Sequence, residues 1–374
     1  MMQDARGVAK RELDTPCLVI DETVLDDNIG KMQAHADGLG KKLRPHAKTH
    51  KCSLIAKKQV AAGAVGVCAA KVSEAEILIA RGLRGVLVTA PVVAERKIDR
   101  LCACAAEDPS VAVVVDDAEN ANALNAAAGR HGIILNVLVD IDSGRGRTGV
   151  PPEQALEFGR TVDSLLHLSL TGIQCYAGHV QHIASFTERR EGSLACMRRA
   201  AAIVRGFRAE GLPCEVFSGA GTGTYDIDSE LPELTELQVG SYAVMDAEYR
   251  SVGSADNPGE FSAFRPSLTL LTTVISSHRH DFVTVDAGLK ALYHHGAAPQ
   301  VVGSSGGTLT YDWFGDEHGK ISFDPAAKKP EAGDVLELVV SHCDPTINLY
   351  DELYVVRGGT VTDVWPVDLR GKSQ

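Results

Sequence analysis

The sequence predicts an α/β fold, namely a (β/α)8 barrel of the TIM type followed by a mostly β domain. Through the first two thirds of the chain, short apolar runs rich in β-branched residues alternate with longer segments rich in Ala, Leu and Glu. This alternation is typical of a parallel sheet covered by helices. Eight such runs lie between residues 42 and 242, which is the strand number of the barrel. A doubly wound open sheet is the structural alternative for this part.

The eight runs are short and almost continuously apolar, which predicts strands buried on both faces. The segments between them have a helical composition, and several lead into Gly, a helix stop signal. An earlier apolar run, "CLVI" at residues 17–20, is outside the count. The eight runs span residues 42–46, 64–68, 85–89, 111–116, 135–142, 168–176, 214–219 and 236–242.

After about residue 250 the pattern changes to strand-like runs such as "SLTLLTTVISS" and "VLELVVSH", with Gly-rich turns and no helical segments between them. The polar segment "SADNPGEFSAFRP" (254–266) is the predicted crossing between the two parts. A chain of 374 residues is long enough for two domains. We expect the barrel over residues 16–250 and the β domain over residues 251–374.

Composition narrows the class of protein and its partners. The formal net charge of −12 argues against a general nucleic-acid binder, because such proteins carry a basic face. The nine cysteines include no C-x-x-C pair, so neither a zinc knuckle nor a thioredoxin motif is expected. No signal peptide is recognisable, and no run approaches the ~20 apolar residues of a membrane span. We therefore predict a cytoplasmic protein whose partner is a small molecule.

The stretch "LRPHAKTHKCS" (43–53) gathers basic residues without one acid among them: Arg44, His46, Lys48, His50 and Lys51. It follows the first predicted barrel strand, where loops of such barrels carry function. A lysine that forms a Schiff base must be partly neutral, and nearby positive charge favours the neutral form. Lys48 is the candidate, and its cationic neighbours would also favour an anionic ligand. A solvated basic loop is the alternative.

The stretch "SGAGTGTY" (218–225) follows the seventh predicted strand and offers three glycines with two threonines. Backbone N–H groups and hydroxyls of such a loop can close on an anion. Loops after strands seven and eight form a recurrent phosphate site in these barrels, and "VGSY" (239–242) would complete it. A plain glycine-rich turn is the alternative. A Schiff-base lysine combined with a phosphate loop indicates pyridoxal 5'-phosphate.

In "VSHCDPT" (340–346), His342 and Asp344 alternate along a predicted strand end, so both could face one divalent ion while Cys343 faces away. A His-x-Asp match is common by chance, and a surface pair is the alternative. His182 lies on the predicted rim of the barrel, after the sixth strand. Asp316, in "GDEHGK", is only weakly indicated as a functional residue when it is taken alone.

These motifs together resemble the metal-activated D-threonine aldolase and D-serine dehydratase group of fold-type III pyridoxal phosphate enzymes. The resemblance runs from "LDTPCLVID" through "RPHAKTHK", "GTGTYD", "ELQVGSYAVMDAEY", "VDAGLKAL" and "DEHG" to "HCDPT" and "VWPV". More distantly, the layout is similar to alanine racemase. The resemblance implies a homodimer with shared active sites, and residues 1–15 joining the β domain.

The resemblance also implies a role for each candidate residue. Lys48 would be the Schiff-base lysine, Arg147 would approach the phenolic oxygen of the cofactor, and His182 would be the base next to the metal. The remaining roles implied are cofactor contacts by His46 and Tyr176, a phosphate cradle of Thr222, Gly223, Gly240 and Ser241, metal ligation by His342 and Asp344, and a substrate contact by Asp316.

The reaction implied is retro-aldol cleavage of a D-3-hydroxy amino acid to glycine and an aldehyde. The substrate could be threonine, phenylserine or 3-hydroxyaspartate. The carboxylate of His-x-Asp suits Mn²⁺ or Mg²⁺, whereas the dehydratases, with His-x-Cys, favour Zn²⁺. Zn²⁺ therefore stays an alternative metal, and dehydration of a D-hydroxy amino acid is the nearest alternative reaction. An amino-acid racemase and a non-catalytic pyridoxal phosphate carrier are the further alternatives.

Overall fold

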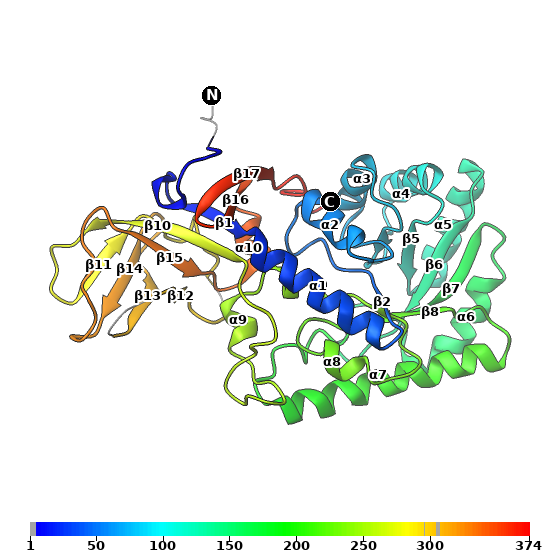
Figure 1. The fold of residues 1–374 in the computed structure, drawn as a ribbon. Helices are drawn as coiled ribbons and strands as arrows, with labels where there is room; N and C mark the ends of the chain where they lie inside the picture. Colours follow the sequence, from blue (N-terminus) through cyan, green and yellow to red (C-terminus); the bar gives the residue numbers. More distant parts are fainter. Residues whose placement is uncertain (1–4, 295, 304–306) are drawn as a thin grey trace. The chain divides into compact units, whose positions relative to one another are not determined.

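The computed structural model describes residues 5–294, 296–303 and 307–374, and the chain divides into two compact units (Figure 1). The barrel unit comprises Gly30–Lys48, Ser53–Gly240 and Gly371–Gln374. The β unit comprises the residues up to Ile29, Thr49–Cys52 and Ser241–Arg370.

The barrel unit contains an eight-stranded parallel sheet in the order β2-β9-β8-β7-β6-β5-β4-β3. A single parallel bridge between His46 and Cys68 joins the two outer strands, which closes the sheet. All eight predicted runs form strands, so the predicted barrel is confirmed. The strands are β2 (Lys42–Leu43), β3 (Cys68–Ala69), β4 (Leu87–Val88), β5 (Ala112–Val115), β6 (Leu135–Asp140), β7 (Leu168–Cys175), β8 (Val216–Gly219) and β9 (Glu236–Leu237).

Helices lie outside the ring of strands (Figure 1). Their ends follow from local sequence: in α5, Asp117 caps the first turn by accepting from the Asn120 N–H, and Gly132 ends the helix at φ 66°. No helix in the described part of the chain is long and apolar enough to cross a membrane. The helices are α1 (Glu22–Gly38), α2 (Ser53–Ala61), α3 (Val72–Ala80), α4 (Glu95–Glu107), α5 (Ala118–His131), α6 (Ala155–Asp163), α7 (Phe186–Ala209) and α8 (Tyr225–Asp228).

The β unit contains a nine-stranded sheet in the order β11-β14-β13-β12-β15-β10-β1-β16-β17. An additional pairing of β11 with β10 closes six of these strands into a second, antiparallel barrel. The predicted β domain is therefore confirmed. The strands are β1 (Cys17–Asp21), β10 (Leu268–Ser276), β11 (Phe282–Val285), β12 (Gln300–Val301), β13 (Leu309–Trp313), β14 (Gly319–Phe323), β15 (Val335–Val339), β16 (Glu352–Arg357) and β17 (Thr360–Pro366). The short helices are α9 (Ala247–Arg250) and α10 (Cys343–Ile347).

The division between the units differs from the expected boundaries at residues 16 and 250. The "CLVI" run is β1, which pairs with β10 and with β16. It therefore belongs to the sheet of the β unit, and the chain enters the barrel unit only within α1. The physical reason is burial: Leu18, Val19 and Ile20 are buried in that sheet.

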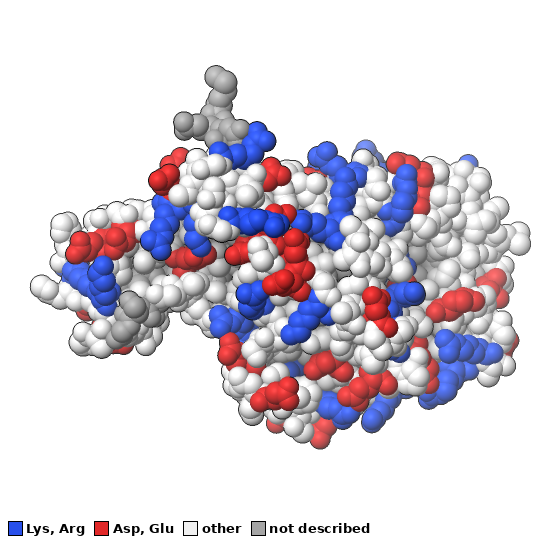
Figure 2. Space-filling model, viewed as in Figure 1, with Lys and Arg blue, Asp and Glu red and all other residues white. Residues whose placement is uncertain are grey.

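Charged side chains of both signs are interspersed over the face of the molecule shown in Figure 2. This face does not carry the continuous basic stripe that a general nucleic-acid binder presents.

Arg44 forms a buried ion pair at the base of the barrel. Its guanidinium donates to both carboxylate oxygens of Glu236, at 2.9 and 2.7 Å, and to the carbonyl of Gly85. Glu236 begins β9 and Gly85 precedes β4, so the pair lies towards the amino-terminal ends of the strands. The expectation that Arg44 adds positive charge beside Lys48 is therefore wrong, because Glu236 neutralises that charge away from the functional rim.

We predict that Arg44→Ala lowers the free energy of unfolding by about 3–5 kcal/mol, because it leaves the Glu236 carboxylate buried without its partner. Urea unfolding of the full chain measures this. Arg160→Ala is the matched control: its pair with Glu210 is exposed, and the loss should be much smaller. Equal losses in the two variants would contradict the prediction.

Candidate active site

A layer of buried polar side chains crosses the barrel near the carboxyl ends of its strands. Gln174 on β7 is its centre. Its amide nitrogen donates to Asp140 Oδ1 at 2.9 Å and to the Thr89 carbonyl at 3.2 Å. Its Oε1 accepts from Gln238 at 3.0 Å, and Gln238 also donates to the Ser218 hydroxyl at 3.0 Å. Side chains or carbonyls of five strand ends are thus fixed relative to one another.

The sequence analysis did not identify Gln174 or Gln238. Each interrupts an otherwise apolar strand run, in "LTGIQCY" and "ELQVG". A buried amide needs hydrogen-bond partners, and that requirement is the signal that could have found them.

Asp140, at the end of β6, is held by this layer. It accepts from Gln174 and from the Thr148 hydroxyl at 2.8 Å. Burial raises the pKa of Asp140 to about 6, and these two hydrogen bonds offset only part of that effect. Asp140 and Gln174 line a small pocket together with Arg147 and Tyr176. The structure therefore brings together two of the predicted cofactor contacts, with Arg147 exposed and Tyr176 half-buried.

Lys48 follows β2 at the same end of the barrel and is half-buried. Its N–H lies 3.4 Å from Nδ1 of His46. The Nε2 of His46 lies 3.0 Å from the Thr89 hydroxyl, and the backbone N–H of His46 donates to Val239 after β9. His46 thus connects the lysine loop with the residues that follow β4 and β9, which restrains the backbone at Lys48.

The glycine loop after β8 forms a tight turn, because the Thr224 N–H donates to the Gly221 carbonyl at 3.1 Å. Thr222 and Gly223 are the two central residues of this turn, and Thr222 is 1% exposed. The glycines are needed for close approach: a Cβ on Gly223 would lie 2.2 Å from the Gln181 carbonyl oxygen. The loop therefore packs tightly against the segment after β7.

The other predicted residues of the barrel unit lie in neighbouring loops. Gly240 is buried and follows β9, whereas His182 is exposed in the turn after β7. Ser241, the fourth predicted cradle residue, is buried and opens a short 3-10 helix that belongs to the β unit.

His342 in the β unit is oriented by a buried carboxylate. Its Nδ1 lies 2.9 Å from Asp246 Oδ2 and 3.4 Å from Glu248 Oε2. Burial lowers the pKa of His342, but the hydrogen bond that its ring donates to Asp246 and the negative charges of Asp344, Asp246 and Glu248 outweigh this effect and raise the pKa to about 9. A histidine whose Nδ1 is held by a carboxylate is the arrangement found in carboxylate–histidine–metal sites.

Asp246 is a further residue that sequence reasoning missed, although it stands in the quoted motif "AVMDAEY". It is fully buried. Its carboxylate also accepts from the Cys343 N–H at 3.0 Å and from the Tyr249 N–H at 2.9 Å. These hydrogen bonds fix the carboxylate, and therefore the ring of His342.

The predicted strand end around His342 is wrong, because His342 is the residue before α10 and Asp344 lies in the first turn of that helix. The thiol of Cys343 is buried and donates to the Met245 carbonyl at 3.2 Å. One buried oxygen of Asp344, Oδ1, accepts no hydrogen bond, while the residue has other interactions. A nitrogen and a carboxylate oxygen are suitable ligands for a divalent ion. Residues 5–294, 296–303 and 307–374 contain no preformed group of three or more such ligands.

Asp316 is exposed in the turn between β13 and β14. Segment 287–294 lies against this hairpin, because the Trp313 indole donates to the Leu292 carbonyl. The same segment contacts the metal-motif region: the Ser341 hydroxyl donates to the Tyr293 carbonyl at 2.6 Å. One segment therefore connects the Asp316 hairpin with the residues around His342.

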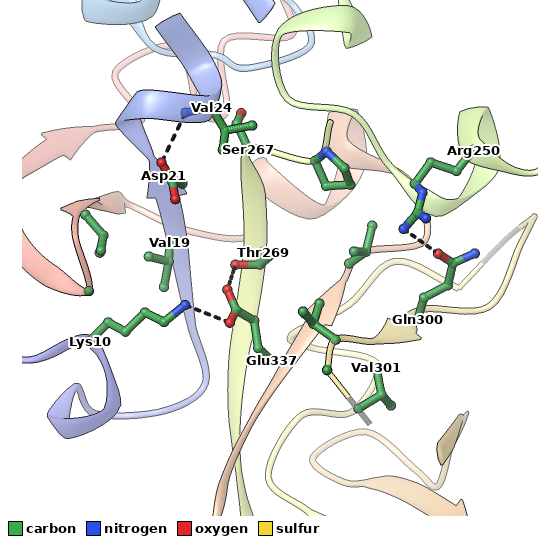
Figure 3. Close-up of a pocket in the computed structure, with 16 residues that line it drawn as sticks. Lys10, Val19, Asp21, Val24, Arg250, Ser267, Thr269, Gln300, Val301 and Glu337 are labelled. Atoms are coloured by element: carbon green, nitrogen blue, oxygen red, sulfur yellow. Dashed lines mark hydrogen bonds and ion pairs between the residues drawn. The ribbon is translucent and has the colours of Figure 1, made fainter. Parts of the chain in front are cut away.

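A separate cavity of about 590 Å³ lies on the sheet of the β unit (Figure 3). None of the predicted site residues lines it. Lys10 and Glu337 form an ion pair at 2.7 Å within it, and Arg250 donates to the side-chain oxygen of Gln300 at 2.9 Å. This cavity is not the candidate active site.

A parallel barrel with a lysine loop at its mouth, followed by an antiparallel β-barrel, defines the alanine racemase-like fold. Residues 20–248 match the family described as "Alanine racemase, N-terminal domain", and residues 267–356 match the "Putative serine dehydratase domain". The chain belongs to the family that combines these two domains.

Several relatives and solved structures match nearly the whole chain. The D-threonine aldolase of Arthrobacter sp is 40% identical over 363 residues, 97% of this chain and 94% of that protein. The 3-hydroxy-D-aspartate aldolase of Paracoccus denitrificans (strain Pd 1222) is 40% identical over 370 residues, 98% of this chain and 95% of that protein. The crystal structure of D-threonine aldolase from Filomicrobium marinum has a TM-score of 0.91 at 35% identity and covers 100% of both chains. The resemblance inferred from the motifs is confirmed.

We predict that Asp140→Asn alters the pH dependence of stability. The pKa of Asp140 is raised from 3.8 to about 6 in the folded protein, so the folded state binds this proton more tightly than the unfolded state. The contribution of Asp140 to stability is therefore present below about pH 4 and is lost as pH rises to about 6. The variant should gain up to about 3 kcal/mol relative to the wild type across this range.

Urea unfolding between about pH 4 and pH 7 measures this difference. Asp142→Asn is the control from the same loop. Burial raises the pKa of Asp142, but hydrogen bonds from the N–H groups of Gly146 and Gly144 outweigh this and lower the pKa below its ordinary value. The contribution of Asp142 to stability is therefore fully present above about pH 4, so the stability difference between its variant and the wild type should stay constant over this range. Parallel pH profiles for wild type and Asp140→Asn would contradict the prediction.

Proposed function

We propose that this protein is a pyridoxal phosphate- and divalent-metal-dependent lyase that cleaves D-3-hydroxy amino acids, such as D-threonine, to glycine and an aldehyde. The observation that carries the proposal is the His342 imidazole held at Nδ1 by Asp246, with Asp344 two residues further along. The relatives named D-threonine aldolase and 3-hydroxy-D-aspartate aldolase, each at 40% identity, support the same reaction class.

The residues at the mouth of the barrel fit pyridoxal phosphate. Bound there, the cofactor would supply an electron-withdrawing ring that accepts the electron pair left on the substrate Cα when its bond to Cβ breaks. Lys48 would hold it covalently, and His46 would fix the lysine loop. Arg147 and Tyr176 would flank it from the loops after β6 and β7. The turn of Thr222 and Gly223, with Gly240 and Ser241, would bind its phosphate.

His342 and Asp344 fit a divalent metal, since an imidazole nitrogen and a carboxylate oxygen are suitable ligands and Asp246 orients the His342 ring through Nδ1. A bound metal would lower the pKa of the substrate β-hydroxyl. His182 would take the proton from that β-oxygen, and Asp316 would contact the substrate. The oxygen ligand favours Mn²⁺ or Mg²⁺ over Zn²⁺.

Dehydration of a D-hydroxy amino acid is the second candidate, because the matched C-terminal family is described as a serine dehydratase domain. A thiolate ligand from Cys343 would favour that reaction by favouring Zn²⁺. The Cys343 thiol is fully buried and donates to the Met245 carbonyl, and burial raises its pKa well above the usual value. These observations support Asp344 as the ligand and hence the aldolase.

Compartment and assembly stay predictions. All nine cysteines are buried free thiols, which supports a reducing compartment such as the cytoplasm. The homodimer with shared active sites is inferred from the family resemblance alone.

The test is to incubate the full chain with pyridoxal phosphate, Mn²⁺ and D-threonine, with L-threonine as the control substrate. We predict glycine and acetaldehyde from the D isomer only. A chelator should abolish turnover, and added Mn²⁺ should restore it. Asp344→Ala should reduce kcat/KM by at least about a hundredfold, while Cys343→Ala keeps it within about tenfold. A 2-oxo acid and ammonia as the main products would contradict the aldolase proposal.

A further inference from the structure

The turn between Gly221 and Thr224 is held on both sides of Gly223 by side chains from outside the loop. The Gly223 N–H donates to Oε1 of Gln181 at 3.0 Å. The Gly223 carbonyl accepts from Nε of Arg189 at 2.8 Å. These two bonds fix the orientation of the two peptide groups that meet at Gly223. The N–H of Gly223 therefore points at Gln181.

The bond to Gln181 continues through a buried chain of hydrogen bonds. Nε2 of Gln181 donates to the Thr224 hydroxyl at 3.0 Å, and this hydroxyl donates to Oδ2 of Asp228 at 2.5 Å. Every hydrogen bond in this series is donated in the same direction, from the Gly223 N–H towards the Asp228 carboxylate. Asp228 is 1% exposed and Thr224 is fully buried, so water does not compete for these bonds.

Asp228 also accepts a second hydrogen bond, from a residue outside the series of hydrogen bonds that starts at Gly223. Its Oδ1 accepts from the Ser193 hydroxyl at 2.5 Å, which anchors the carboxylate to α7. One oxygen of Asp228 thus contacts the helix and the other contacts the turn. The hydroxyls of Ser193 and Thr224 lie at the same distance from Asp228 and are both fully buried, but only Thr224 belongs to the turn.

Arg189 completes the arrangement from the other side. The residue is fully buried, and its Nη1 also donates to the Ile183 carbonyl at 2.6 Å. A buried guanidinium and a buried carboxylate are both costly to desolvate. Each has one hydrogen bond to the same four-residue turn, in addition to its partner outside the turn: Nε of Arg189 donates to the Gly223 carbonyl, and Oδ2 of Asp228 accepts from the Thr224 hydroxyl. Both charged groups therefore hold the turn.

We propose that Asp228, Thr224, Gln181 and Arg189 are positioning residues that preorganise the turn Gly221–Thr224 to receive the phosphate group of the cofactor. The inference rests on the proposed function, which assigns the phosphate to this turn. Beyond that function, we infer that the affinity for the phosphate depends on these buried residues, which hold the turn in shape. A preformed turn loses less conformational entropy on binding, so disorder in it weakens binding of the phosphate selectively.

The experiment compares binding of pyridoxal 5'-phosphate with binding of pyridoxal, which lacks the phosphate, to the full chain freed of cofactor. The ratio of the two Kd values isolates the contribution of the phosphate. Thr224→Val removes the hydroxyl that links Gln181 to Asp228, and Ser193→Ala removes the matched hydroxyl on α7. Thr224→Ser restores the hydroxyl. Thermal unfolding of each variant verifies that it is folded.

We expect Thr224→Val to weaken pyridoxal 5'-phosphate binding by about tenfold or more with little change for pyridoxal. Ser193→Ala should leave the ratio within about twofold of the wild type, and Thr224→Ser should restore it. Inorganic phosphate should compete less well for Thr224→Val than for the wild type.

If the ratio of the two Kd values for Thr224→Val equals that of the wild type, the inference is wrong and the proposed function is unaffected. The same holds if Thr224→Val weakens binding of both ligands equally. A wild-type protein that forms no adduct with either ligand would overturn the proposed function as well. The two failures are therefore distinguishable.

Discussion

The hydrogen bonds of one buried amide, Gln174, determine how the functional end of the barrel is organised. A primary amide inside a barrel must have its hydrogen-bonding groups satisfied, and Gln174 satisfies its own with partners on β4, β6 and β9 or the residues that follow them. Thr89, whose carbonyl accepts from this amide, contacts His46 through its hydroxyl, and His46 contacts the lysine loop. The position of Lys48 thus follows from strands far from it in sequence.

The same arrangement recurs at two other parts of the candidate site, where a group that would contact a ligand is held by a buried side chain. Asp246 holds the ring of His342. Gln181 and Arg189 hold the turn of Thr222 and Gly223. In each case the supporting residue is more buried than the residue it supports or is buried to a similar degree. A preorganised site needs such support, because a loosely held group loses affinity and rate.

The sequence predicted the barrel because each of its strands is an apolar run between helical segments, a pattern set by local burial. It did not predict that the "CLVI" run joins the β unit, because its partners β10 and β16 lie in the last third of the chain. The partner of Arg44 is 192 residues away, so charge composition within one loop could not show that this guanidinium is neutralised. Asp246 was missed for the same reason, since its role exists only through contacts across the fold, whereas Gln174 could have been found as a polar residue within an apolar strand. His342 and Asp344 could be named from their spacing, but the helix that carries Asp344 could not.

Lys48 as the covalent attachment point of the cofactor is the claim on which the functional account depends most. Borohydride reduction of the cofactor-loaded chain, followed by peptide mapping, tests it directly. The account predicts a reduced pyridoxyl label on the peptide that contains Lys48, and no label after Lys48→Ala. A label on Lys51 or on any other lysine, or an unlabelled protein that still turns over substrate, would contradict it.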